Sequence, residues 1–380
     1  MKNSSQSVKS RHQREKKDIL RWKGFKSDKL YVGPRLVNFH LTNVCNLTCR
    51  FCWYHSKRTT QKKWEKRFLD LKIFKKTIAE CRRMGTERIL FSGEGEPLLH
   101  PKFRQLVDCV AHAGLSLSVN TNATMIDRFP SSVLKRINNF NINISEVGSA
   151  AYSHMQSDDK SLFNKVVDNC RFVADIKRRY DHPQIKIFFI LNRENFRHIR
   201  RVFDLALHLG ADALFLKLAS VNKATKHIAL TRPFFADLKA EVCHLLKNPK
   251  LRRMETNTKT FGQFLLKARF FDACEDVHFD HGYFRTFYFD RFFKQGFQCP
   301  NGWYAALIDI RGYVFLCCNH QQFIVGNIHH NNFEDIWYSK AAQDARLKMK
   351  YDFNINDQLW RECHYCDREK STTPVIICDG

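Results

Sequence analysis

The sequence predicts an α/β protein: a partial (β/α)6 TIM-like barrel followed by a small C-terminal α+β domain. From residue 35 to about residue 220, short apolar or β-branched runs alternate with longer segments of helical period, the pattern of repeated βα units around a parallel sheet. After Cys299 the pattern changes to a hairpin followed by a helix. Six βα units are too few to close an eight-stranded barrel, but right-handed crossovers curl them into part of one.

The elements of the barrel follow in order from this alternation. The predicted strands are 36–41, 88–92, 115–120, 141–145, 185–191 and 213–218. Two helices between them show apolar residues at helical spacing and a glycine stop, 68–84 before Gly85 and 196–209 before Gly210. Beyond the barrel, helical stretches are predicted at 234–246, 261–271 and 333–349, and a hairpin at 305–310 and 313–316 around Arg311 and Gly312.

These elements divide the chain into four parts. Residues 1–34 form a basic N-terminal tail that we expect to be disordered or peripheral, and residues 35–230 form the partial barrel. Residues 231–295 read as a helical connector rich in Phe, Lys and Arg, and residues 296–380 as the small C-terminal domain. A chain of 380 residues is long enough for one large domain and a smaller one.

The composition limits the classes of partner. Hydrophobic residues make up 44% of the chain, which is ample for a buried core, and 63 Lys and Arg against 38 Asp and Glu give a net charge of +25. That excess favours an anionic partner such as a nucleic acid, a phosphate or a nucleotide-linked substrate. The alternative is ordinary solvated surface charge, because the excess is spread along the whole chain.

Cysteine usage and hydropathy indicate the compartment. No window approaches the ~18 consecutive apolar residues of a membrane span, so we expect no membrane insertion. The N-terminal segment lacks the apolar stretch of a signal peptide. The 14 cysteines therefore point to a reducing, cytoplasmic interior, where thiols bind metal or stay reduced rather than form disulfides.

One loop gathers three thiols directly after the first predicted strand. Cys45, Cys49 and Cys52 lie within eight residues, on a segment that can wrap around a metal. Three cysteines ligate three of the four irons of a cubane cluster and leave the fourth open. A structural zinc site is the main alternative, but it needs four closed ligands, usually two separated pairs.

Polar and glycine-rich segments follow the later strands. The second strand ends in the sequence Ser-Gly-Glu-Gly-Glu-Pro at 92–97, and taken alone this would be an ordinary turn. The third to fifth strands are followed by Asn120 to Asn122, by Asn143 and Ser145, and by Asn192 to Asn195. Any one of these is best explained as a turn or cap, but the carboxyl ends of barrel strands meet at one face.

A second set of cysteines lies near the C-terminus: Cys299, Cys317, Cys363 and Cys366. The hairpin brings the first two together, and Cys363 and Cys366 form a distant Cys-x2-Cys pair. Four soft ligands make a closed site that suits zinc and an iron-sulfur cluster about equally. Cys318 is a less suitable substitute for Cys317, and the roles of Cys274 and Cys378 stay open.

The Cys-x3-Cys-x2-Cys loop after a first strand, with Phe51 beside its last cysteine, resembles the signature of the radical S-adenosylmethionine (SAM) superfamily. The segment Gly95-Glu96-Pro97 is similar to the end of that family's Gly-Gly-Glu-Pro loop, with Glu94 in place of the first glycine. Asn120-Thr121-Asn122 resembles its Thr-Asn-Gly, with Ala123 in place of the glycine. The strand ends match in order.

The resemblance implies a 4Fe-4S cluster on Cys45, Cys49 and Cys52, with SAM chelating the open iron. It implies that Glu96 accepts a hydrogen bond from the SAM ammonium group and that the glycines allow close backbone approach. The expected SAM pocket comprises Phe51, Gly93, Gly95, Glu96, Pro97, Asn120, Asn122, Asn143, Ser145 and Asn192.

The second cysteine set resembles the auxiliary-cluster extension called SPASM, in its shortened twitch form. A full SPASM domain continues after the Cys-x2-Cys pair with three more ligands, whereas this chain continues with Asp367 to Gly380 and only Cys378. The resemblance therefore implies one auxiliary 4Fe-4S cluster with all irons ligated, held by Cys299, Cys317, Cys363 and Cys366.

The function that this resemblance implies is that of a radical SAM oxidoreductase. Reductive cleavage of SAM gives a 5′-deoxyadenosyl radical that abstracts a substrate hydrogen, and the auxiliary cluster accepts an electron, so that a sugar- or cyclitol-like small molecule is dehydrogenated or epimerised. A maturase acting on a ribosomally made peptide is the alternative, and an iron-sulfur protein that binds nucleic acid is the alternative of another class.

The same resemblance implies partners but leaves the catalytic residues open. A reductant such as flavodoxin or ferredoxin is expected, together with a small-molecule or peptide substrate that the positive charge would favour as an anion. Arg193 and Lys217 are weak candidates for a catalytic base, since both lie near strand ends. The sequence does not indicate the identity of the substrate or the oligomeric state.

Overall fold

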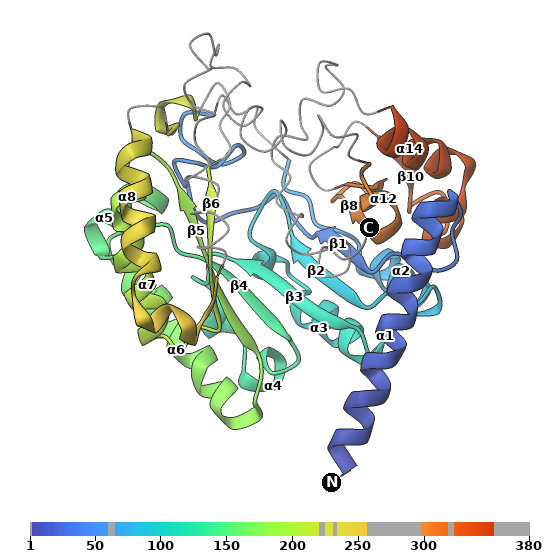
Figure 1. The fold of residues 1–380 in the computed structure, drawn as a ribbon, viewed down its shortest axis with the longest axis horizontal. Coiled ribbons are helices and arrows are strands. Elements are labelled where there is room, and N and C mark those ends of the chain that lie inside the picture. The colour runs from blue at the N-terminus through green and yellow to red at the C-terminus, as the bar shows by residue number, and fades with distance from the viewer. Residues whose placement is uncertain are drawn as a thin grey trace.

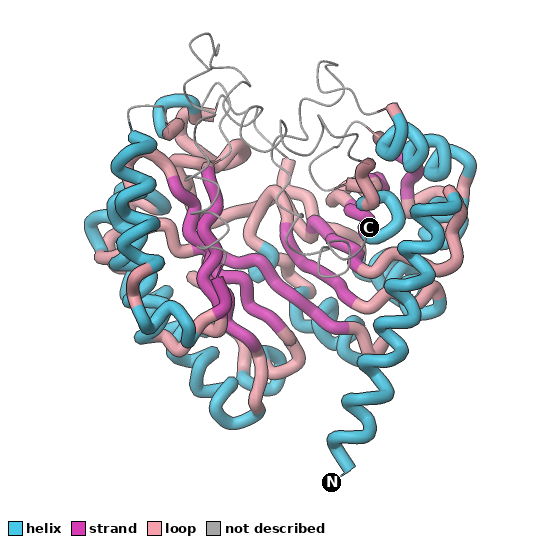
Figure 2. Tube along the Cα trace, in the orientation of Figure 1, coloured by secondary structure: helices cyan, strands magenta, loops and turns pink. Residues whose placement is uncertain are grey.

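A computed structural model of the chain describes residues 2–59, 65–219, 225–230, 234–256, 298–317 and 323–352, with backbone only for residues 2–14, 218 and 235. Its centre is one sheet in the order β10-β9-β8-β1-β2-β3-β4-β5-β6-β7 (Figures 1 and 2). The strands are β1 (Leu36–His40), β2 (Arg88–Ser92), β3 (Ser116–Thr121), β4 (Asn139–Asn143), β5 (Gln184–Leu191), β6 (Ala213–Leu218), β7 (Glu255–Thr256), β8 (Ala305–Ile308), β9 (Tyr313–Phe315) and β10 (Ile324–Asn327).

The predicted α/β class with a parallel sheet is confirmed, and all six expected strands are present as β1 to β6, paired in parallel. The fourth strand begins two residues earlier than expected, at Asn139, because the Asn-rich segment alternates: Phe140 and Ile142 are buried while the asparagines face the other side. The third is one residue late, at Ser116 to Thr121.

The strand β7 and the parallel pairing of β8 with β1 were not expected. β7 extends the sheet beyond β6, and β8 pairs in parallel with β1, with Leu36 opposite Ala305. The predicted hairpin is confirmed as β8 and β9, which pair antiparallel, but it also continues the barrel sheet rather than standing apart. The hairpin thereby covers the edge of β1, whose backbone groups would otherwise lack partners.

Helices lie outside the sheet, as Figure 1 shows for α4, α6, α7 and α8. The helices are α1 (Lys2–Ser27), α2 (Leu71–Arg83), α3 (Phe103–His112), α4 (Ser131–Leu134), α5 (Ser149–Gln156), α6 (Leu162–Tyr180), α7 (Ile199–His208), α8 (Phe235–Leu246), α12 (Asn301–Tyr304), α13 (Phe333–Tyr338) and α14 (Lys340–Tyr351). Short 3-10 turns are η1 (Pro97–Leu99), η2 (Ile126–Arg128), η3 (Phe196–His198), η4 (Lys226–Ile228) and η6 (Pro249–Arg253).

Capping residues explain why two of the observed helices have other bounds than the predicted ones. The helix expected from residue 68 begins at Leu71, because the Asp70 carboxylate accepts hydrogen bonds from the amides of Lys72 and Ile73. The helix expected over 333–349 is two helices, since Ser339 ends α13 and its hydroxyl caps α14. The helical stretch predicted at 261–271 lies outside the described residues.

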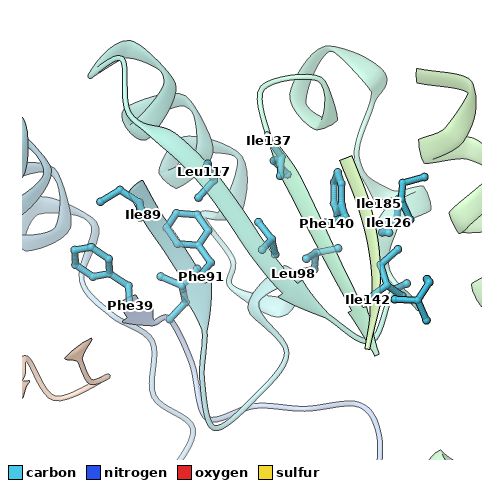
Figure 3. Close-up of a cluster of buried hydrophobic side chains, with 14 of the residues drawn as sticks. Phe39, Ile89, Phe91, Leu98, Leu117, Ile126, Ile137, Phe140, Ile142 and Ile185 are labelled. Carbon is cyan, nitrogen blue, oxygen red and sulfur yellow. The ribbon is translucent and has the colours of Figure 1, made fainter. Parts of the chain in front are cut away.

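The main core lies between the sheet and these helices. Side chains point alternately to the two faces of β1, and the fully buried Val37 and Phe39 face the helices. Phe39 contacts Phe74 of α2 edge to face with ring centroids 4.9 Å apart, and Phe74 continues to Phe91 of β2 at 5.7 Å. Figure 3 shows how this apolar layer runs on through Leu117 and Phe140 on neighbouring strands.

The opposite, inner face of the sheet is polar on β3 and β4, whereas β5 and β6 carry the stacked rings of Phe188 and Phe215 there. The Asn141 amide donates to the Asn120 side-chain oxygen at 2.8 Å, and the Ser92 hydroxyl donates to that of Asn38 at 2.7 Å. Asn120 is exposed even though it sits in the middle of the sheet order, on β3. The inner face of the open barrel therefore presents amides and hydroxyls to solvent, and the loops after the strands gather at its carboxyl edge.

The N-terminal segment differs from the expected disordered or peripheral tail. It forms α1, and the Arg21 side chain of this helix is 1% exposed. The Arg21 guanidinium donates to Glu87 at 2.6 Å, to Asp18 at 2.9 Å and to the Gly33 carbonyl at 3.1 Å. Apolar contact is confined to the end of the helix, where Phe25 meets Trp303 with ring centroids 5.3 Å apart, so the sequence shows no continuous apolar face along α1.

None of the described helices combines the length and apolar character that crossing a bilayer requires.

Candidate functional site

The three-cysteine loop begins five residues beyond the end of β1 and turns tightly. The Cys52 amide donates to the Cys49 carbonyl at 2.9 Å, which folds the last two cysteines back on one another. Cys49 Sγ lies 3.5 Å from the Gln156 carbonyl oxygen, and the His55 amide donates to Cys52 Sγ at 3.3 Å. The loop is thus held at the carboxyl end of β1, against the end of α5.

The surroundings of these thiols fit a cationic group. Burial raises the pKa of Cys45 to about 12 and that of Cys49 well above its usual value, and the neighbouring thiols add mutual repulsion. Backbone amides of Leu47 and His55 oppose this by stabilising the thiolates of Cys45 and Cys52. Among the described residues no three His, Cys, Asp or Glu surround a single ion, whereas a cubane needs each thiol at a different iron.

The glycine loop after β2 is hydrogen-bonded to the segment that leads into Cys45. The Gly95 amide donates to the Thr42 carbonyl at 3.0 Å, and the Glu96 amide donates to that of Val44 at 2.8 Å. A Cβ atom at Gly95 would lie 2.2 Å from the Val44 carbonyl oxygen, so only glycine allows this approach. Gly93 has φ +141° and lies against His40.

Glu96 joins this loop to the end of β3. Its carboxylate is buried and accepts hydrogen bonds from the Thr121 hydroxyl and the Asn122 amide, both at 2.7 Å, and from the Leu98 amide at 3.2 Å. Burial raises the pKa of Glu96 to about 7, and the three donors oppose that rise. Its predicted bond to SAM stays a prediction; the structure adds that both oxygens already have protein donors.

Asn122 links the cysteine loop to the end of β3. Its side-chain amide donates to the Asn46 oxygen at 3.0 Å, and Asn46 in turn donates to the Thr124 hydroxyl at 2.8 Å. Asn46 directly follows Cys45, so this network fixes the start of the cysteine loop. The sequence did not single out Asn46 or Thr124, although both flank predicted site residues.

The end of β4 is joined to the cysteine loop by Gln156, which is fully buried. Its side-chain oxygen accepts from the Ser145 amide at 2.6 Å, and the Ser145 hydroxyl donates to Asn143 at 2.9 Å. Because the Gln156 backbone carbonyl contacts Cys49, this residue links two predicted parts of the pocket. No pattern in the sequence marked Gln156, since it lies at the end of a helix.

The end of β5 is a compact turn. Asn192 is buried, and its side-chain oxygen accepts from the Glu194 amide at 2.9 Å. Glu194 accepts from Arg50 of the cysteine loop at 2.9 Å and lies 3.1 Å from the His154 ring. This strand end therefore braces the cysteine loop, and the predicted contact of Asn192 with SAM stays a prediction.

Phe51 provides an apolar wall beside the cysteines. It is half-buried and packs with Ile190 against a small cluster of Ala219, Ile228 and Ala229, which follow β6. A flat apolar surface next to the cysteine loop suits the face of an aromatic ring. The sequence predicted Phe51 at the site but missed the residues after β6 that complete the wall.

Titratable side chains from β1, β2 and β8 meet at the same edge. His40 Nδ1 lies 4.0 Å from the Glu94 carboxylate, and both side chains are at most 10% exposed. Burial lowers the pKa of His40 to about 4, which nearby Asp309 opposes, and burial raises the pKa of Glu94. Such paired shifts at a strand-end edge are typical of functional groups.

The described half of the second cysteine set lies at the opposite end of β8. Cys299 precedes α12 and Cys317 follows β9, and the Asn301 amide donates to the Leu316 carbonyl at 2.8 Å, which ties the two segments together. The two cysteine sites therefore follow opposite ends of the strands, and β1 spans roughly 13 Å at about 3.3 Å per residue. Cys363, Cys366, Cys274, Cys318 and Cys378 lie outside the described residues.

The two weak candidates for a catalytic base, Arg193 and Lys217, lie on different segments of the sheet edge and face. Arg193 is exposed in the turn after β5, and its backbone amide donates to the Ile228 carbonyl at 3.0 Å. Lys217 Nζ lies 5.0 Å from the centre of the Phe188 ring on the inner face of the sheet. Neither assignment is tested by the structure.

An open parallel barrel whose first loop clusters three half-buried thiols is typical of a metal-cluster protein of the α/β class. Residues 39–153 match the model of the radical SAM superfamily, and residues 299–367 match the SPASM model, described as an iron-sulfur cluster-binding domain. The chain carries a radical SAM domain and a SPASM domain. Its cofactors are accordingly a SAM-binding 4Fe-4S cluster and an auxiliary iron-sulfur cluster.

Curated relatives match at low identity. The AdoMet-dependent heme synthase of Methanosarcina barkeri is 22% identical over 92% of this chain and 91% of that protein. The Fe-coproporphyrin III synthase of the same organism is 27% identical over 45% of this chain, and the match spans only 40% of that relative.

Solved structures share the fold. SuiB of Streptococcus suis bound to S-adenosylmethionine superposes with a TM-score of 0.61 at 15% identity, covering 85% of this chain and 70% of that one. The structure of anSMEcpe with bound AdoMet gives a TM-score of 0.56 at 15% identity, covering 87% and 85%.

Proposed function

We propose that this chain is a radical SAM oxidoreductase that removes a hydrogen atom from an anionic organic substrate and passes an electron to its auxiliary cluster. The observation that carries the proposal is the set of hydrogen bonds joining the loop of Cys45 to the ends of β2, β3 and β4. These bonds gather the predicted SAM ligands around the three thiols at one edge of the sheet.

Different residues of the chain have different roles in this proposal. Cys45, Cys49 and Cys52 would hold the SAM cluster, and Phe51 would supply an apolar wall for the adenine ring. Glu96 and Gln156 hold the loops in register through their buried hydrogen bonds. When bound, the reduced cluster and SAM supply the 5′-deoxyadenosyl radical that takes the substrate hydrogen.

His40 and Glu94 are better placed than Arg193 or Lys217 to move a proton during oxidation. Both lie at the edge where β1, β2 and β8 end, between the cysteine loop and the hairpin of the SPASM region. A carboxylate whose pKa is raised is a stronger base than an ordinary one, so Glu94 can accept the proton beside the neutral imidazole of His40.

An anionic substrate is supported by the charge of the protein and its inner face. The net charge is +25, and Lys186 and Lys217 are carried by β5 and β6 in register with Asn141 and Ile190. The sugar- or cyclitol-like substrate stays a prediction. The relative that matches nearly the whole chain is named a heme synthase, which makes carboxylate-bearing macrocycles a class to test first.

SAM cleavage tests the proposal without knowledge of the substrate. The protein is reconstituted anaerobically with iron and sulfide, reduced, and incubated with SAM, and 5′-deoxyadenosine is measured by mass spectrometry. We expect formation by the wild type and by Cys109→Ala, which alters a half-buried cysteine on α3, and none by Cys49→Ala. A fully loaded, reduced wild type that forms no 5′-deoxyadenosine would overturn the assignment.

A peptide maturase is the second candidate. The structure of SuiB bound to its precursor peptide SuiA covers 91% of this chain with a TM-score of 0.62, at an identity that supports a common fold alone. Incubation with carboxylate-rich macrocycles, cyclitols and peptides encoded near this gene separates the classes. A product lighter by two hydrogens identifies the substrate class, and tight nucleic-acid binding without SAM cleavage would favour the non-enzymatic alternative.

A further inference from the structure

Arg346 of α14 is fully buried, with 0% exposure. Its Nε donates to the Gly302 carbonyl at 2.8 Å and its Nη2 to the Trp337 carbonyl at 2.9 Å. The guanidinium also stacks 4.3 Å from the centre of the Trp337 ring. These contacts hold the side chain in one place but supply only neutral partners.

Within the described part of the chain, the positive charge of Arg346 has no carboxylate partner. No hydrogen bond is made by its Nη1, which is buried, and burial lowers its pKa to about 9. The other buried cations are treated differently, since Arg21 contacts Asp18 and Glu87, and Lys350 contacts Asp28 at 2.7 Å. A buried charge without a counter-charge is strongly destabilising, so we expect an anion close to Arg346.

The second cysteine set lies close to this charge. Gly302 follows Cys299 by three residues, and Asn301 bonds the carbonyl directly before Cys317. A Cβ atom at Gly302 would lie 2.9 Å from Arg346 Cγ, so the arginine stem lies directly on α12. Three residues of chain span at most about 11 Å, so Cys299 lies within that distance of Gly302, on which the arginine stem packs.

We propose that Arg346 is the buried counter-ion of the auxiliary cluster and raises its reduction potential. The proposal rests on Cys299 and Cys317 ligating that cluster. Four thiolates outweigh the positive charge of an iron-sulfur core, so the site is an anion and becomes more negative when it takes up one electron. A fixed cation nearby stabilises the reduced form more than the oxidised form, which favours electron transfer from a substrate radical.

The midpoint potential of the auxiliary cluster tests this directly. Replacing Cys45, Cys49 and Cys52 by alanine leaves the auxiliary cluster as the one to be followed, by electron paramagnetic resonance during a redox titration. In this background we expect Arg346→Met to lower the reduced-to-oxidised ratio at fixed potential at least tenfold, equal to 59 mV for one electron. Arg346→Lys keeps the charge and should retain most of the wild-type potential.

The matched control removes another cation of α14, one whose charge is screened by water. The Lys340 side chain is 90% exposed, so Lys340→Met should leave the potential unchanged. Equal iron content is required in all proteins compared. An unchanged potential in Arg346→Met with its iron retained would overturn the proposal and assign Arg346 to packing against Trp337.

If Arg346→Met does not retain iron, the iron content of Arg346→Lys decides between a role of the charge and a role in packing. Iron retained by Arg346→Lys and lost by Arg346→Met supports the counter-ion, because charge is then the property that matters. Loss from both variants assigns the residue to packing and overturns the proposal. Neither readout needs SAM cleavage, so a failure of the proposed activity would be seen separately.

Discussion

The Thr121 hydroxyl donates a 2.7 Å hydrogen bond to the buried carboxylate of Glu96, joining the loop after β2 to the end of β3. The same carboxylate accepts the Asn122 amide, and Asn122 holds Asn46 beside Cys45. Glu96 therefore controls the cysteine loop from a distance, through backbone and side-chain donors rather than through the thiols themselves.

Glu96→Gln should weaken SAM binding about tenfold or more. The new amide group places a donor where Glu96 accepts from Asn122 or Thr121, and an unsatisfied buried donor is destabilising by about 1–3 kcal/mol. Calorimetric titration of the reconstituted protein with SAM measures the change. Glu65→Gln removes an exposed carboxylate and should bind normally. Unchanged affinity in Glu96→Gln would show that Glu96 does not set the pocket.

Gly95→Ala should prevent stable assembly of the cysteine loop. The added Cβ would meet backbone atoms of Val44 at 2.2 to 2.7 Å, and backbone cannot yield as a side chain can. Iron content after reconstitution should fall by about half, since the auxiliary cluster remains. Gly210→Ala is the control: its Cβ would meet nothing within 4 Å, and its φ of +65° predicts a loss of only about 1 kcal/mol in the free energy of unfolding.

The sequence was sufficient wherever the signal was local. The cysteine spacing, the glycine loop and the alternation of β1 to β6 are patterns within a few residues, and each predicted strand is present. The pairing of β8 with β1 joins distant segments, and nothing in either strand marks its partner. Gln156 was missed for the same reason, because its role follows from what folds against it.

Charged residues hid the remaining features. Basic composition suggested that the first residues form a disordered or peripheral tail, yet α1 docks through Arg21. Arg346 in a surface-type sequence gave no sign of complete burial. Hydrophobic periodicity locates the apolar faces of helices, but it does not detect packing through buried ion pairs.

Iron counting separates the two cysteine sets. The wild type should hold about eight irons per chain, and Cys49→Ala and Cys299→Ala about four each, because either loss removes one cubane. The iron assay is paired with measurement of 5′-deoxyadenosine. Cys299→Ala should still cleave SAM, since its cluster is not the one that SAM approaches, whereas a loss of cleavage there would mean that the two sites are not independent.

His40 should make the folded protein sensitive to acid. Burial lowers its pKa to about 4, whereas the unfolded chain titrates near 6.5. Below about pH 6.5 the unfolded state therefore binds a proton that the folded state does not. The contribution of His40 to stability is present above pH 6.5 and is lost as the pH falls toward 4, by about 3 kcal/mol in all.

Glu96 has the opposite sign, because its raised pKa of about 7 makes the folded state the better proton binder between pH 4.5 and 7. The quantity to compare is therefore the change in the free energy of unfolding between pH 7 and pH 5, in the wild type and in His40→Asn. Glu96 contributes equally to both proteins, so its contribution cancels. Urea unfolding of the cluster-free proteins at pH 5 and pH 7 provides it. We expect His40→Asn to lose less stability than the wild type between pH 7 and pH 5; equal losses would mean that Glu94 and Asp309, which face the ring, keep His40 protonated in the folded state.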